Sequence, residues 1–221
     1  MRYHIKKEKS VFFIIPVVQV LSSVRYFKSY KQAVSSIIFI ISSVLVSLLI
    51  YRILSVLISK NYKYFMPLSV LLLAFLDQAH KFLLEITGLN CNIISEFFKV
   101  RQTKNENQAA ILNHFNITLD LPLVICLKFL LLAAFAICLY KINNPDLKAG
   151  CILLAAAQIT SIFDSIYRGY ILDSFYYYKL VCYDIKDYYV DAGAALILMV
   201  ALFSAKKNNA VGECTSEEPG S

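Results

Sequence analysis

Asp77, Asp164 and Asp191 lie within long apolar segments of this 221-residue chain, and Asp173 lies in the loop that joins the last two of these segments. Ionisable side chains in an apolar environment are costly, so by default they mark a functional site. Two carboxyl groups close together in such a place cannot both ionise, which leaves one as an acid and one as a base. The four aspartates are therefore our candidates for proton-transfer chemistry.

The elements that position these acids are predicted to be membrane-spanning helices. Hydrophobic residues make up 58% of the chain and charged residues 17%, and the apolar residues form long blocks. A helix of roughly 20 residues crosses a bilayer core about 30 Å thick and satisfies its own backbone hydrogen bonds. We predict five such helices, with residues 33–51, 64–84, 121–140, 149–167 and 188–205.

The predicted fold class is thus an all-α integral membrane protein. Residues 64–207 form a four-helix core, and residues 1–63 form an N-terminal extension with one clear transmembrane helix. The apolar run 11–24 is short for a span and contains Pro16, so we interpret it as an interfacial or re-entrant segment. Residues 208–221 are polar and are predicted to be a disordered cytoplasmic tail.

Lysines at alternate ends of the core helices set the expected orientation. They are Lys60 and Lys63, Lys141 and Lys148, and Lys206 and Lys207. Positive residues favour the cytoplasmic side, so all four aspartates should lie at the outer face. Basic residues before the first span conflict with this topology, unless the run 11–24 also crosses.

Several of these charges also have a purely structural interpretation. Asp77 and Lys81 are one helical turn apart, as are Asp164 and Arg168, so each pair could simply be an ion pair. Asp191 is followed by small residues that let helices pack closely, so it should face the helix bundle. Lys128 stands alone in its predicted span and is expected to extend outward to the membrane surface.

The order of these residues resembles that of the lipoprotein signal peptidases, membrane aspartyl peptidases that remove signal peptides from lipid-modified bacterial prolipoproteins. Residues 77–81, Asp-Gln-Ala-His-Lys, look like the family's Asp-Gln-x-x-Lys. Residues 164–173 look like the stretch that carries the first catalytic aspartate, and residues 188–191 look like the Asn-x-Ala-Asp that carries the second. The resemblance covers roughly residues 64–207.

The resemblance implies that Asp173 and Asp191 are the catalytic pair. The residues it assigns to supporting roles are Asp77, Lys81, Asn105, Asn107, Ser161, Asp164 and Arg168. The sequence departs from the family where Thr160-Ser161 replaces Gly-Asn, Ser165 replaces Arg, and Tyr188 replaces Asn. The family's Asn-x-Gly-Ala-Ala-Phe is matched only approximately by residues 105–111.

In this interpretation one carboxylate activates water and the other, protonated, donates to the scissile carbonyl. The implied partners are lipidated prolipoproteins and membrane lipids, at the outer side of a bacterial inner membrane. No motif indicates a metal, cofactor or nucleic acid, and the sequence is compatible with a monomer. Two alternatives stay open: a weakened relative that binds lipidated peptides, and a small proton-linked transporter that uses the buried acids as relays.

Overall fold

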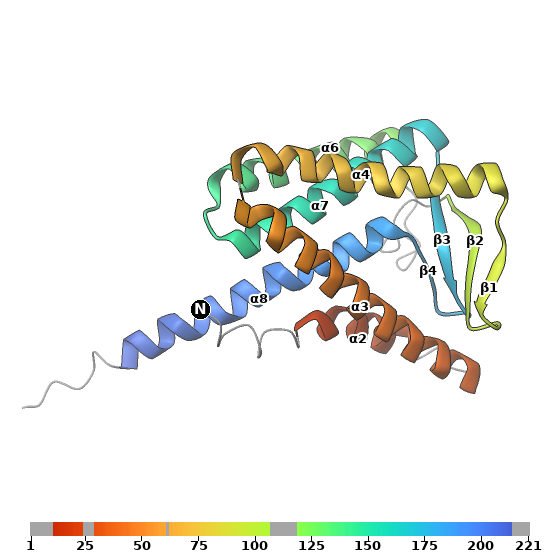
Figure 1. Cartoon of the computed structure of the whole chain (residues 1–221), viewed down its shortest axis with the longest axis horizontal. Helices are drawn as coiled ribbons and strands as arrows, with labels where there is room; N and C mark the ends of the chain where they lie inside the picture. The colour runs from red at the N-terminus through yellow and green to blue at the C-terminus, as the bar shows by residue number, and fades with distance from the viewer. Residues whose placement is uncertain (1–10, 24–28, 61, 107–118, 214–221) are drawn as a thin grey trace, which may run out of the picture.

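A computed structural model describes residues 11–23, 29–60, 62–106 and 119–213, and helices dominate it (Figure 1). The helices are α2 (Val11–Ser23), α3 (Tyr30–Lys60), α4 (Tyr62–Thr87), α6 (Leu121–Lys141), α7 (Pro145–Phe163) and α8 (Ile185–Glu213). A short π-helix, η2 (Asp164–Arg168), continues α7.

Four segments of the described helices are long and apolar enough to cross a membrane: Tyr30–Leu54, Met66–Thr87, Leu121–Lys141 and Pro145–Arg168. The predicted class, a helix-dominated membrane protein, is confirmed. The fifth predicted span, 188–205, lies within α8. That helix continues to Glu213, into the segment predicted to be disordered, and residues 214–221 lie outside the described residues.

Helix α7 forms the centre of the core and packs against α4, α6 and α8. Its buried residues include Ala155, Ala156 and Ala157, whose small side chains allow close helix contacts. Helices α7 and α8 come close together at two glycines. A Cβ atom on Gly150 would lie 3.0 Å from the carbonyl oxygen of Gly193, so a side chain there would push the helices apart.

A four-stranded antiparallel sheet, which the sequence analysis did not foresee, lies at one end of the helical bundle (Figure 1). Its strands, in spatial order, are β1 (Cys91–Ile94), β2 (Phe98–Asn105), β3 (Ile171–Tyr177) and β4 (Val181–Tyr183). The segment between α4 and α6 therefore pairs with the segment between η2 and α8. β3 is rich in aromatic residues, which favour strands. One of them, Tyr177, is fully buried, so this run is part of the core.

The N-terminal extension packs against the core on the α8 side, where α2 and α3 both contact α8. Helix α2 contains Pro16 but remains a helix over Val11–Ser23. Hydrogen bonds from Gln19 and Ser43 join the extension to the region around α8. Gln19 donates to Tyr183 at 2.7 Å and to Asp191 at 3.1 Å, and Ser43 donates to Asp191 at 2.8 Å.

Candidate active site

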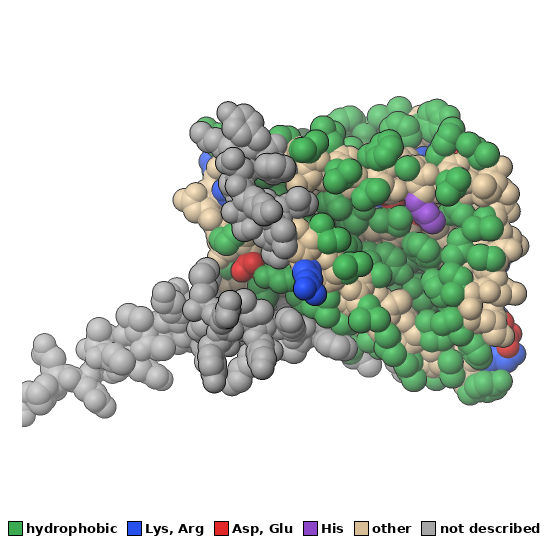
Figure 2. Space-filling model, in the orientation of Figure 1, with side chains coloured by type: hydrophobic (Ala, Val, Ile, Leu, Met, Phe, Trp, Pro, Cys, Tyr) green, Lys and Arg blue, Asp and Glu red, His purple; other side chains and the backbone are tan. Residues whose placement is uncertain are grey.

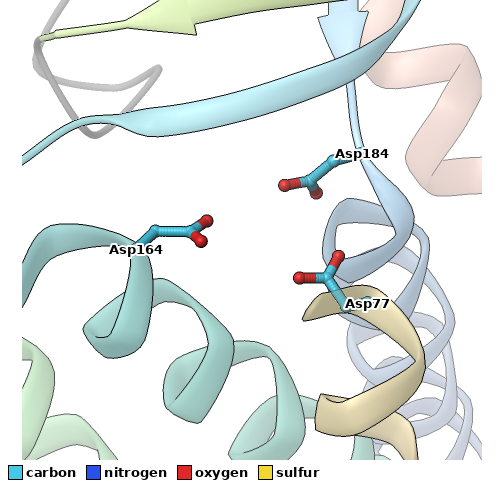
Figure 3. A group of neighbouring side chains, drawn as sticks. All are labelled: Asp77, Asp164 and Asp184. Atoms are coloured by element: carbon cyan, nitrogen blue, oxygen red, sulfur yellow. The ribbon is translucent and has the colours of Figure 1, made fainter. Parts of the chain in front are cut away.

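A buried lysine lies at the meeting point of three aspartates from three elements. The Nζ of Lys81 lies 2.9 Å from Asp77, 2.6 Å from Asp164 and 2.7 Å from Asp184. Figure 3 shows the three carboxylates, from α4, the end of α7 and the residue before α8, pointing toward a common centre. All four side chains are fully buried. The charges thus hold α4, α7 and α8 together next to the sheet.

A second set of polar contacts ties η2 to α4. The guanidinium of Arg168 donates to Asp164 at 2.8 Å, to Gln78 at 2.8 Å and to both oxygens of Glu85, at 2.8 and 2.9 Å. Gln78 in turn donates to Asp164 at 3.0 Å. The predicted i,i+4 pairs Asp77–Lys81 and Asp164–Arg168 are both present, but each belongs to this larger network.

Asp173 lies on β3, close to two aspartates that the sequence analysis did not single out, Asp184 and Asp187. One carboxylate oxygen from each of the three falls within 4.8 Å of the others. Gly169, with φ 74°, ends η2 and starts the turn into β3, which brings Asp173 to this position. Asp173 also accepts a hydrogen bond from Asn105 at the end of β2.

Asp184 and Asp187 form a reciprocal cap at the start of α8. The backbone N–H of Asp187 donates to Asp184 at 3.1 Å, and the backbone N–H of Asp184 donates to Asp187 at 3.0 Å. This is the capping-box arrangement, which fixes both carboxylates relative to the helix end. Lys186 contributes twice, because its ammonium pairs with Asp184 and its backbone N–H donates to Asp77 at 3.0 Å.

The acids of this group differ in their affinity for protons. Burial raises the pKa of Asp173 to about 7, against the positive charge of nearby Lys186. Burial and the charge of Asp184 raise the pKa of Asp187 well above its usual range. Burial would also raise the pKa of Asp184, but Lys186 and Lys81 outweigh it and lower that pKa. These shifts favour the protonated forms of Asp173 and Asp187 and the ionised form of Asp184.

The structure does not bring the predicted second catalytic residue, Asp191, into this group. Asp191 lies one turn further along α8, where its carboxylate accepts hydrogen bonds from Ser43 at 2.8 Å, Tyr183 at 2.9 Å and Gln19. It faces the bundle, as its small neighbours indicated. Its contacts are those of an anchor for the N-terminal extension, and Asp187 occupies the position beside Asp173.

The remaining predicted residues have mixed outcomes. Ser161 is buried, and its backbone oxygen accepts from Lys128 at 3.3 Å and from Ser165 at 2.8 Å. Asn107 lies outside the described residues. The expectation that Lys128 extends outward is wrong: it is buried and donates to the Ser165 hydroxyl at 2.6 Å. The serine that replaces the family's arginine therefore binds a lysine from α6.

The carboxylates form two sets with the spacing of metal ligands, Asp77 with Asp164 and Asp184, and Asp173 with Asp184 and Asp187. The ammonium of Lys81 lies within ion-pair distance of all three members of the first set. That set therefore already has its cation. In the second set, Asp184 is paired with both Lys81 and Lys186. Lysine charges supplied by the chain itself thus contact every acid of the first set and Asp184 of the second.

Comparison with known proteins identifies one matching family model and solved structures with a similar fold. The family model for signal peptidase (SPase) II matches residues 68–203. A solved structure described as a bacterial membrane enzyme at 2.3 Å resolution is similar with a TM-score of 0.58 and 18% identity, over 73% of this chain and 98% of that one. A second, described in the same way at 1.9 Å, has a TM-score of 0.57 and 18% identity, over 65% and 96%. These similarities show a shared fold. No curated protein sequence matches the chain.

Proposed function

The chain belongs to the signal peptidase II family, and we propose that it is a membrane aspartyl endopeptidase that removes signal peptides from diacylglyceryl-modified prolipoproteins. The observation that carries this proposal is the position of Asp173 beside Asp187 at the junction of sheet and helices, with different proton affinities. The family membership supports a lipoprotein substrate, and the four apolar helices make the chain a multi-pass membrane protein.

In the proposed reaction, ionised Asp173 takes a proton from a water molecule while the oxygen of that water attacks the scissile carbonyl carbon. Protonated Asp187 donates its proton to the carbonyl oxygen, so the tetrahedral intermediate carries no isolated negative charge. When that intermediate collapses, the carbon–nitrogen bond breaks and the proton on Asp173 passes to the leaving amine. The oxygen returns its proton to Asp187, which restores the starting state.

The surrounding charges hold this pair in place. The capping hydrogen bonds fix Asp187 through one of its oxygens, and a carboxylic acid can carry its proton on the other. Asn105 positions Asp173 from the neighbouring strand. Asp184, kept ionised by two lysines, adds negative charge that favours the protonated form of Asp187. We propose these groups as positioning residues and Asp173 and Asp187 as the catalytic residues.

We expect purified protein in lipid to cleave a precursor whose cysteine carries diacylglycerol, and to cleave the same precursor without lipid at least ~10²-fold less efficiently. Acyl chains in the bilayer would set the depth of the scissile bond, so their loss removes the positioning that makes cleavage efficient. Mass spectrometry of both products measures this. If no lipidated precursor is cleaved, the better explanation is that the chain is a family member that only binds lipidated peptides.

The proposed location is a bacterial inner membrane with the acids facing outward, motivated by the lysines at alternate helix ends. In a variant without the native cysteines, a single cysteine introduced at the exposed Lys179, between β3 and β4, should react with a membrane-impermeant thiol reagent in intact cells. Cysteines in the tail beyond residue 208 should react only after the membrane is opened. Labelling of the tail in intact cells would show the opposite topology and contradict the proposed orientation.

A further inference from the structure

A cavity of about 420 Å³ lies where the N-terminal extension meets the peptidase core. Its walls are residues of α3, such as Ile50 and Ile53, and residues of α4, such as Leu72 and Leu76. Phe175 of β3 and the first turns of α8 complete it. Helix α3 precedes residues 68–203, the region that matches the family model, so the extension supplies one wall of this cavity.

The lining fits hydrocarbon and offers little to a polar ligand. Nearly all of it is aliphatic or aromatic, and the hydroxyl groups of its two tyrosines are already engaged. Tyr189 donates to the backbone oxygen of Leu73 at 3.1 Å, and the Tyr188 hydroxyl lies 2.7 Å from that of Tyr177. An apolar cavity of about 150 Å³ already excludes water and binds small hydrocarbons, so this larger one suits a longer apolar chain.

The mouth of the cavity opens toward lipid. Ile53 and Leu72, on opposite walls, are 52% and 48% exposed, and both lie on segments that can cross the membrane. Figure 2 shows that apolar side chains cover much of the face that α3 and α4 present. A ligand would therefore enter sideways from the hydrocarbon region of the bilayer.

One end of the cavity is lined by residues that are close in sequence to the candidate active site. Ile185 lines the cavity and lies between Asp184 and Lys186, two residues before Asp187. A chain that extends from the lipid face to Ile185 would end beside the catalytic pair. Two lining residues, Phe175 and Ile185, are thus each two positions from a proposed catalytic aspartate, Asp173 and Asp187.

We propose that this cavity binds one acyl chain of the substrate's lipidated cysteine, and that α3 gives the N-terminal extension a role in substrate selection. The inference rests on the proposed function. In the bound state the chain would replace bilayer lipid between α3 and α4 and bring the scissile bond to Asp173 and Asp187. Acyl length, rather than a polar contact, would then decide how well a substrate binds.

Ile53→Trp and Leu72→Trp test the proposal, because each fills the cavity from one wall. In either variant, the KM for a dipalmitoyl precursor should rise roughly tenfold or more, while the KM for a dioctanoyl precursor should stay nearly normal. The kcat for each precursor should not change. The matched control is Leu45→Trp, on an exposed part of α3 away from the cavity lining, which should change neither KM. Equal effects on both precursors, or none, would overturn the proposal.

A binding readout separates this inference from the proposed function. A lipopeptide with a photoreactive group at the end of one acyl chain should crosslink to residues of α3 and α4 that line the cavity, and Ile53→Trp should suppress this product. Labelling elsewhere would overturn the proposal even if cleavage is normal. So would labelling by a photoreactive phospholipid that excess lipopeptide does not displace. If the protein cleaves no precursor, the proposed function fails. The crosslinking result still shows whether the cavity binds an acyl chain.

Discussion

Asp173→Asn and Asp187→Asn are each expected to lower the rate of prolipoprotein cleavage by at least ~10³-fold, because asparagine keeps the shape of the side chain but cannot exchange the proton. The double variant should be little worse than either single variant, since groups that act as a unit are not additive. A time course of cleavage of a diacylglyceryl precursor by purified variants, at matched abundance in membranes, measures the effect.

Asp191→Asn is the matched control for this experiment. The amide keeps one acceptor for the hydrogen bonds of Ser43 and Tyr183, so we expect measurable activity with a modest loss of thermal stability. Normal cleavage by Asp187→Asn together with complete loss in Asp191→Asn would show that the second catalytic carboxylate is Asp191, as the spacing in the sequence predicted, and would contradict the geometry.

The pH profile gives an independent check on the roles of the two acids. Asp173 must be ionised to accept a proton, and its pKa is raised to about 7, so the rate should rise as the pH increases through about 7. Asp187 must be protonated, and its pKa is raised well above the usual range, so the rate should fall again in more alkaline solution. A rate that is already maximal at pH 5 would mean that Asp173 is not the base.

The sequence was sufficient for the helices and for much of the site, because apolar length and charge pairing are local properties. Asp77, Lys81, Asp164 and Arg168 lie on helical segments whose spacing alone pairs them, and the structure contains both pairs. The family match, over residues 68–203, confirms the resemblance. The spacing could not predict that Asp184, which is far from Lys81 in the sequence, is also a partner of that lysine.

The prediction of Asp191 as the second catalytic residue, where we now propose Asp187, followed from the expected start of α8. Counting the apolar residues placed the helix start at 188, with Asp187 in the preceding loop, whereas α8 begins at Ile185. The pattern Asp184-x-x-Asp187 before an apolar run is close to a capping-box signature and would have located the helix end. The family's spacing between the two aspartates favoured Asp191 and assumed a connecting loop of the family's length.

The sheet and the burial of Lys128 depend on contacts between segments far apart in the chain. β2 and β3 pair across most of the core sequence, with Thr103 opposite Asp173, and no local pattern fixes that register. Lys128 is buried because Ser161 and Ser165 of the neighbouring helix accept its hydrogen bonds. A lone lysine in a predicted span carries no sequence signal for partners on another helix.

Lys81→Ala is expected to have the largest effect on folding. Removing one partner of a buried ion pair typically costs about 3–5 kcal/mol, because the remaining charge is left uncompensated in a poorly solvated place. Asp164 would still contact Arg168, and Asp184 would still contact Lys186. For Asp77, the contacts that would persist are hydrogen bonds from Gln78 and the backbone of Lys186. The loss of stability should therefore concentrate on Asp77.

The double variant Lys81→Ala with Asp77→Asn should recover part of that loss, since it removes the uncompensated carboxylate as well as the ammonium. Thermal unfolding in detergent, together with the amount of folded protein in membranes, measures the single and double variants. Lys128→Met is the control, because it removes a buried lysine that lies outside this ion-pair cluster. It should lower the free energy of unfolding by about 1–3 kcal/mol, the usual range for buried groups that lose a hydrogen-bond partner. Equal damage in the double and single variants would mean that Asp77 does not depend on Lys81, and that the ammonium acts through Asp164 and Asp184 alone.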